Sequence, residues 1–69
     1  MDSLVNVRLY SYKSFRHYGG REITTIPYIC SAILIEEQRD HTFYVELTED
    51  CALFKKGHRI AVLPKDYNV

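Results

Sequence analysis

Five side chains in the sequence could bind a metal ion, but their spacing argues against it. They are three histidines and two cysteines: His17, His41, His58, Cys30 and Cys51. Structural zinc sites take ligands from closely spaced pairs such as C-x2-C or H-x3-H, and no two of these five residues have that spacing. We therefore predict no metal site and no other cofactor.

The candidates for catalysis are equally weak. Cys51 follows Glu49 and Asp50, and neighbouring acids disfavour the thiolate that a nucleophile needs. Cys30 lies in an apolar run, where a thiol is inert. Three further acids fall in a polar stretch that we expect to be a solvated turn: Glu36, Glu37 and Asp40. Acid–base pairs need a cleft that shifts their pKa values, so we predict that the protein is not an enzyme.

The strongest functional signal is a stretch in which aromatic rings alternate with cations. Its members that we expect to bind a partner are Tyr12, Lys13, Phe15, Arg16, Tyr18 and Arg21. In proteins that bind single-stranded nucleic acid, rings stack on bases and cations contact phosphates. Tyr and Arg are also enriched in the hot spots of protein–protein interfaces. Since the chain is short, some of these rings could instead belong to the core, but at least two of them should be exposed and form the binding surface.

The distribution of charge bears on this choice. The formal net charge is zero and the pI is about 6.8, which weighs against a strong nucleic-acid binder. Residues 1–21 carry four basic side chains and one acid, residues 22–50 carry seven acids and one arginine, and residues 51–69 again carry four basic side chains and one acid. A secondary basic patch is expected in the last third: Lys55, Lys56 and Arg59.

These observations favour a small interaction module without enzymatic activity, which binds a protein partner through residues 12–21. Chains of this size are often accessory regulators or inhibitors of a larger protein, as in phage and plasmid genomes. The alternative is a small β-barrel that binds RNA or single-stranded DNA with the same rings and the secondary basic patch.

The element that must organise the fold is the longest apolar run, residues 26–35. Periodicity alone does not separate a strand from a buried helix in so short a run, and Thr25 and Pro27 would suit the start of a helix. We predict a strand because β-branched isoleucines fit a pleated sheet better than a helical turn. Pro27 cannot donate to a sheet ladder, so it should mark an edge, a bend or the start of the strand.

Alternating apolar and polar residues predict strands over residues 4–10, 42–47 and 58–63, and an extended segment over 21–26. Residues 11–20 are predicted as a loop or a ragged hairpin arm. A hairpin should join residues 33–35 to 42–47, with Phe43 and Val45 inside and residues 37–41 exposed. One helical turn is expected over residues 48–54. Residues 65–69 are expected to be a tail, although its Tyr67 could dock.

This order of elements resembles a small SH3-like barrel of four or five antiparallel strands, with one short helical turn before the last strand. An OB-fold is the nearest alternative, but it normally has a longer chain and a full helix. All 69 residues are expected to form a single small β-barrel domain.

The remaining predictions concern the environment of the chain. No apolar segment reaches the roughly 20 residues that span a bilayer, and the start does not resemble a signal peptide. Two cysteines do not form a disulfide framework, so we expect a cytoplasmic protein with reduced thiols. A core this small with an apolar central strand should leave apolar surface or strand edges exposed, which predicts a homodimer.

Overall fold

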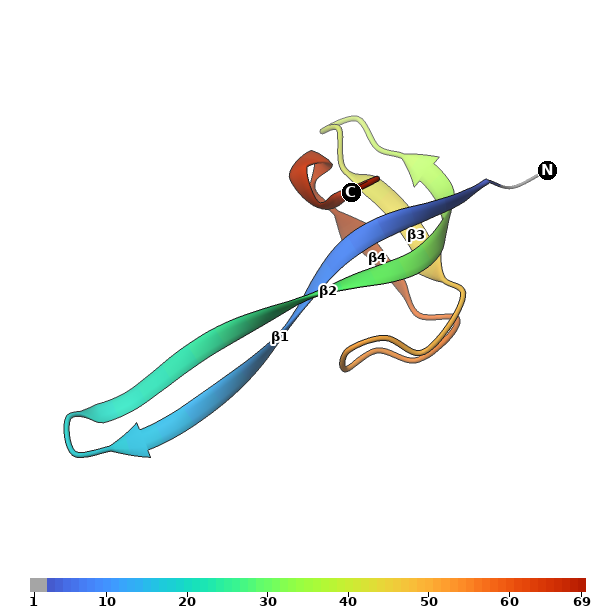
Figure 1. Ribbon diagram of the computed structural model, residues 1–69. Helices are drawn as coiled ribbons and strands as arrows, with labels where there is room; N and C mark the ends of the chain where they lie inside the picture. The colour runs from blue at the N-terminus through green and yellow to red at the C-terminus, as the bar shows by residue number, and fades with distance from the viewer. Residues whose placement is uncertain (1–2) are drawn as a thin grey trace.

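The computed structural model describes residues 3–69, which contain four β-strands and one 3-10 turn. The strands are β1 (Leu4–His17), β2 (Gly20–Glu37), β3 (Phe43–Leu47) and β4 (Arg59–Val62), and the turn is η1 (Pro64–Asp66). Each strand pairs antiparallel with the next (Figure 1). The prediction of an all-β fold with four antiparallel strands is confirmed. The sheet is open, with β1 and β4 at its two edges.

The apolar run 26–35 lies entirely within β2, so the strand prediction is confirmed. Only one of its faces is covered: Cys30 and Ala32 are buried, whereas Ile29 and Ile35 are exposed. The register between β2 and β3 shifts between Leu34 and Glu36, which is a β-bulge. Because a bulge bends its strand, it accounts for β2 turning from β1 towards β3 at this end of the sheet (Figure 1).

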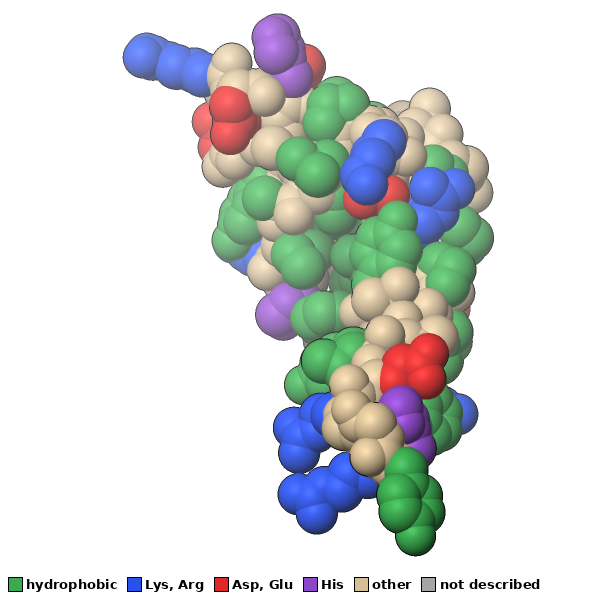
Figure 2. All heavy atoms as spheres, turned by 90° about the vertical axis from the view of Figure 1, so that its left-hand side faces the viewer, with side chains coloured by type: hydrophobic (Ala, Val, Ile, Leu, Met, Phe, Trp, Pro, Cys, Tyr) green, Lys and Arg blue, Asp and Glu red, His purple; other side chains and the backbone are tan. Residues whose placement is uncertain are grey.

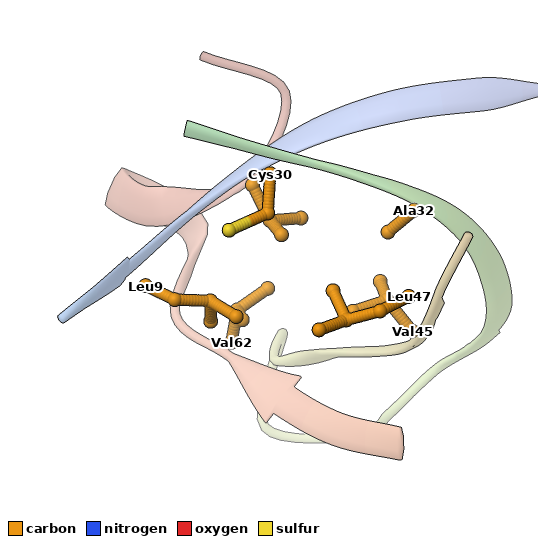
Figure 3. Packing of buried hydrophobic residues seen from close by; sticks show 7 residues of the cluster. Leu9, Cys30, Ala32, Val45, Leu47 and Val62 are labelled. Carbon is orange, nitrogen blue, oxygen red and sulfur yellow. The ribbon is translucent and has the colours of Figure 1, made fainter. Parts of the chain in front are cut away.

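Seven buried side chains form the core, and they come from all four strands. They are Val7, Leu9, Cys30, Ala32, Val45, Leu47 and Val62. Figure 3 shows them pointing into the space that the curved sheet encloses. In the β2–β3 hairpin, Val45 is fully buried, Phe43 packs against the core, and residues 37–41 are exposed, as predicted.

The prediction of reduced thiols is wrong. Cys30 on β2 and Cys51 in the β3–β4 connection form a disulfide across a sequence separation of 21 residues. The disulfide joins a buried position to the long β3–β4 loop, whose Phe54 also packs against the core. It therefore acts as the covalent staple that so small a core calls for.

The predicted helical turn over residues 48–54 is also wrong. These residues form bends and a tight turn instead, in which the backbones of Cys51 and Phe54 exchange two hydrogen bonds of 2.9 Å. Ala52 has a φ of 54°, which is incompatible with a right-handed helix. The disulfide at Cys51 and a 2.7 Å hydrogen bond from the Lys56 backbone N–H to the Asp50 carboxylate fix this shape. The 3-10 turn follows β4.

The last residues do not form a free tail. Val69 donates a backbone hydrogen bond of 3.2 Å to the carbonyl of Asn6, and Tyr67 forms an isolated bridge with Val7. The ring of Tyr67 stacks on Phe43 with centroids 3.8 Å apart, which confirms its docking. The chain end thus lies along the first part of the outer edge of β1.

Asp66 anchors this chain end. It is buried, and its carboxylate accepts a hydrogen bond of 2.9 Å from the Tyr10 hydroxyl and lies 3.4 Å from the Arg8 guanidinium. Asp66→Ala should lower the free energy of unfolding by about 1–2 kcal/mol, because the Tyr10 hydroxyl and the Arg8 guanidinium lose their acceptor. The loss is no larger because water can partly rehydrate both donors. Urea denaturation measures this loss. The control Lys65→Ala, at an exposed neighbour, should leave the midpoint unchanged, and equal midpoints for both variants would contradict the role of Asp66.

Candidate interaction site

The predicted binding residues lie on a two-stranded arm that projects from the body. We define the arm as residues 11–26, which form a regular ladder from Ser11 opposite Ile26 to His17 opposite Gly20. The prediction of a loop or ragged arm is corrected to a continuous hairpin that closes at residues 18–19. Figure 1 shows the arm leaving the body, and it accounts for the elongated extents of 53 × 26 × 17 Å.

The local sequence explains why the arm closes tightly. Gly20 has a φ of 124°, a backbone conformation that side chains with a Cβ rarely adopt. The Gly19 backbone N–H also donates a 3.3 Å hydrogen bond to Nδ1 of His17. The ladder itself continues the β1–β2 register of the body, so the arm is an extension of the core hairpin.

The register divides the arm into two faces, because residues opposite each other in an antiparallel pair point to the same side. We call the side with Tyr12 the tyrosine face, and its pairs are Tyr12–Thr25, Ser14–Ile23 and Arg16–Arg21. The other side is the phenylalanine face, and its pairs are Ser11–Ile26, Lys13–Thr24, Phe15–Glu22 and His17–Gly20. The six predicted binding residues are therefore brought onto one arm but not onto one face, and Tyr18 lies in the turn.

Large apolar side chains stand in solvent along the arm. Their exposed fractions are 66% for Tyr12, 51% for Phe15, 111% for Tyr18 and 63% for Ile23. The prediction that at least two rings of this segment are exposed is confirmed, and their role in binding stays a prediction. Ile23 was missed by the sequence argument. It stood outside the alternation of rings and cations, and only the register places it beside Ser14 on the tyrosine face.

The charges of the arm are distributed unequally between its faces. On the phenylalanine face, Oε2 of Glu22 lies 3.6 Å from Nε2 of His17. On the tyrosine face, Arg16 and Arg21 are directly opposite each other, and no acid of the arm shares that face. Figure 2 shows blue side chains projecting from one side of the arm near its tip, with red and purple side chains on the other side. Lys13 shares the phenylalanine face with Glu22 and His17. Like charges in a cross-strand pair repel, so the arginine pair favours an anion or a ring above it.

The secondary basic patch is largely neutralised within the body. Arg59 donates a 2.9 Å hydrogen bond to Glu46, and Lys55 lies 3.8 Å from Asp50. The patch belongs to β4 and to the β3–β4 connection, which lies on the body, away from the tip of the arm (Figure 1). The structure thus does not bring the two basic ends of the sequence together at the tip.

The acidic turn between β2 and β3 has an internal explanation. The Thr42 hydroxyl donates a 2.6 Å hydrogen bond to Asp40, which lowers the pKa of that exposed carboxyl below its usual range. The same carboxylate accepts a 3.2 Å hydrogen bond from the Thr42 backbone N–H, which is typical of an Asp that caps the backbone of its own turn. Among residues 3–69, no group of three His, Cys, Asp or Glu side chains could hold a metal ion, and no helix is long and apolar enough to cross a membrane.

A shallow groove lies between the outer edges of β1 and β4. Its volume is about 410 Å³, and its walls include Leu9, Phe54 and Val62. Its one carboxylate, Asp66, is already bonded to Tyr10. The groove offers mainly apolar contact and was not visible in the sequence, because it arises from strands that are far apart in the chain.

Comparisons of the chain with protein-family models, curated proteins and solved structures give no match. The function is therefore inferred from the geometry of the arm.

Proposed function

We propose that the protein is a non-enzymatic interaction module whose arm docks on a larger protein as an accessory regulator or inhibitor. One observation supports this most: the arm exposes Tyr12, Phe15, Tyr18 and Ile23 on a regular two-stranded support. Exposed apolar patches rimmed by polar groups mark interaction sites. Because Tyr has few rotatable bonds, it provides a large contact area at a small entropic cost.

A further part of this proposal is that the body is an opened variant of an SH3-like barrel. The support is the order of the last elements: η1 follows β4 directly, and the chain end then returns to β1 at Val7. A barrel of this kind would be completed by a fifth short strand along the outer edge of β1.

The arm's role can be tested by alanine substitution at its tip. Tyr18→Ala and Arg16→Ala should each weaken binding of the partner protein by about 2 kcal/mol or more, as expected for anchors buried at an interface. The matched control is Leu53→Ala, which truncates an exposed apolar side chain on the body and should bind like the wild type. Binding is measured by calorimetry with a partner purified by affinity capture. If all three variants bind equally, the arm is not the site.

The arginine pair supports the nucleic-acid alternative, and salt dependence separates the two functions. A nucleic-acid complex should weaken steeply between about 50 and 200 mM salt, with a log–log slope of roughly −0.7 per phosphate contacted on a single strand. A protein complex held by aromatic anchors should weaken only modestly. Capture from a lysate with and without nuclease provides the material for both measurements.

A further inference from the structure

The two edges of the arm differ in what their backbones offer. The carbonyl of Asn6 accepts its hydrogen bond from Val69, which lies outside the β1–β2 ladder. Alternate residues of a strand direct their backbone groups to opposite sides, so the even-numbered residues of β1 point away from β2. In the arm, the N–H and C=O groups of Tyr12, Ser14 and Arg16 therefore line an outer edge that no described strand covers.

The corresponding edge of β2 is interrupted by a proline at the base of the arm. Pro27 lies opposite Tyr10, so its nitrogen points to the outer side of β2. Proline has no N–H to donate, and prolines at edge strands prevent further strand pairing. β1 contains no proline from Leu4 to His17. The free edge of β2 therefore ends at Thr25, whereas that of β1 presents an uninterrupted row of donors and acceptors from Arg16 through Tyr10.

The side chains of β1 in the arm are complementary to those of a second copy of β1 that runs antiparallel to it. If two copies of β1 pair antiparallel with Ser14 opposite Ser14, Tyr12 of one copy faces Arg16 of the other. On the opposite face, Lys13 of one copy faces Phe15 of the other. Every cation between residues 12 and 16 then lies across from an aromatic ring, an arrangement that attracts, and the small Ser14 lies where the copies meet.

Other registers lose this complementarity. Centring the pair on Lys13 or on Arg16 places like charges directly opposite each other, which is unfavourable. Centring it on Phe15 places Arg16 opposite Ser14 and Lys13 opposite His17, so no cation between residues 12 and 16 faces a Tyr or Phe ring. In a register shifted by one residue, an even-numbered residue would lie opposite an odd-numbered one. The N–H and C=O groups of the odd-numbered residue point towards β2, so the two residues could not exchange hydrogen bonds.

We propose that the protein forms a symmetric dimer in which the arm segments of β1 pair antiparallel about Ser14. The inference rests on the proposed role of the arm and names a second copy of the chain as the occupant of its β1 edge. The result is a closed, isologous interface in a four-stranded ribbon with the order β2-β1-β1-β2. Arg16 moves onto a ring of the second copy, which offsets its repulsion from Arg21. Both faces of the ribbon stay open to a further partner.

Proline substitution tests the edge. Ser14→Pro removes an outward N–H of β1, whereas the matched control Thr25→Pro removes an outward N–H from the edge of β2, which the proposed dimer leaves unpaired. Neither change removes a β1–β2 hydrogen bond. Sedimentation equilibrium should give twice the 8.1 kDa chain mass for wild type and Thr25→Pro, and at least a tenfold higher dimer dissociation constant for Ser14→Pro. Far-ultraviolet circular dichroism verifies that both variants fold. A monomeric wild type, or equal dissociation constants for both variants, overturns the proposal.

Cysteine cross-linking tests the register. Residues that form a hydrogen-bonded antiparallel pair have Cα atoms about 5.5 Å apart, which lies within the range for a disulfide. Ser14→Cys should therefore cross-link into a covalent dimer under mild oxidation. In the same register the two copies of position 12 are offset by about 14 Å along the ribbon, four strand residues at about 3.4 Å each. Tyr12→Cys should then stay uncross-linked, and equal or faster cross-linking at position 12 overturns the register.

The dimer and the proposed function fail separately. A monomeric protein that still captures its partner through Tyr18 refutes the dimer and leaves the proposed function intact. A dimer sensitive to Ser14→Pro that captures no partner refutes the proposed function alone. If the wild type is a monomer and Ser14→Pro abolishes partner capture, the edge belongs to a strand of the partner, which also overturns the dimer.

Discussion

Leu47→Ala is expected to lower the free energy of unfolding by about 2–5 kcal/mol. The side chain is 1% exposed and belongs to the seven-residue core. Removing its branched end leaves a cavity that the disulfide-tied sheet can fill only in part. Because small domains are stable by only about 5 kcal/mol or a little more, this one substitution removes a large share of the total stability. Chemical denaturation at equilibrium measures the loss.

The chain offers a matched control for this prediction. Leu53→Ala deletes the same atoms from a side chain that is 68% exposed. Exposed substitutions of this kind change the unfolding free energy by about 0.5 kcal/mol or less. If both leucine variants unfold at the same denaturant concentration, the core assigned to the concave side of the sheet is wrong.

The core strands could be predicted because their sequence carries a physical signal. Val45 and Leu47 alternate with polar neighbours on β3, and the isoleucine-rich run forms β2. Alternation of this kind is typical of a strand in a sheet that has one face on the core and one face in water. The polar stretch between β2 and β3 then had to be the turn, and residues 37–41 are indeed exposed.

The arm could not be predicted as a regular hairpin, because its pairing does not come from its own residues. Tyr12, Phe15 and Tyr18 are spaced three apart, which matches neither a strand nor a covered face. The register is inherited from Val7 and Leu9 in the core and continues outward to Gly20. The residues suggested a candidate surface, but only the ladder shows that the rings fall on both faces and that Ile23 joins them.

The connection between β3 and β4 was mispredicted for a related reason. Thr48 and the acids after it are typical of a helix start, and local sequence offered nothing against it. A long-range bond decides the conformation instead, since Cys51 is tied to Cys30. The sequence contained both cysteines, but the assumption of a reducing compartment hid their pairing.

Loss of the Cys30–Cys51 disulfide is expected to destabilise the protein by about 3 kcal/mol, the chain-entropy value for a closed loop of this length. The bond closes a loop with a sequence separation of 21 residues, and this closure lowers the conformational entropy of the unfolded chain. For a domain of this size the melting temperature should fall by about 12–24 °C. Thermal unfolding with and without a thiol reductant measures the change.

The double variant Cys30→Ala/Cys51→Ala separates the effect of the bond from side effects of the reductant. It should melt at or below the temperature of the reduced wild type, and reductant should not shift it further. A wild type whose melting temperature is the same in both conditions would show that the disulfide contributes nothing. The outcome also bears on where the protein works. Disulfides persist mainly in oxidising compartments, so a large shift argues against the predicted cytoplasmic location, since reduction there would leave a core of seven buried side chains without its staple.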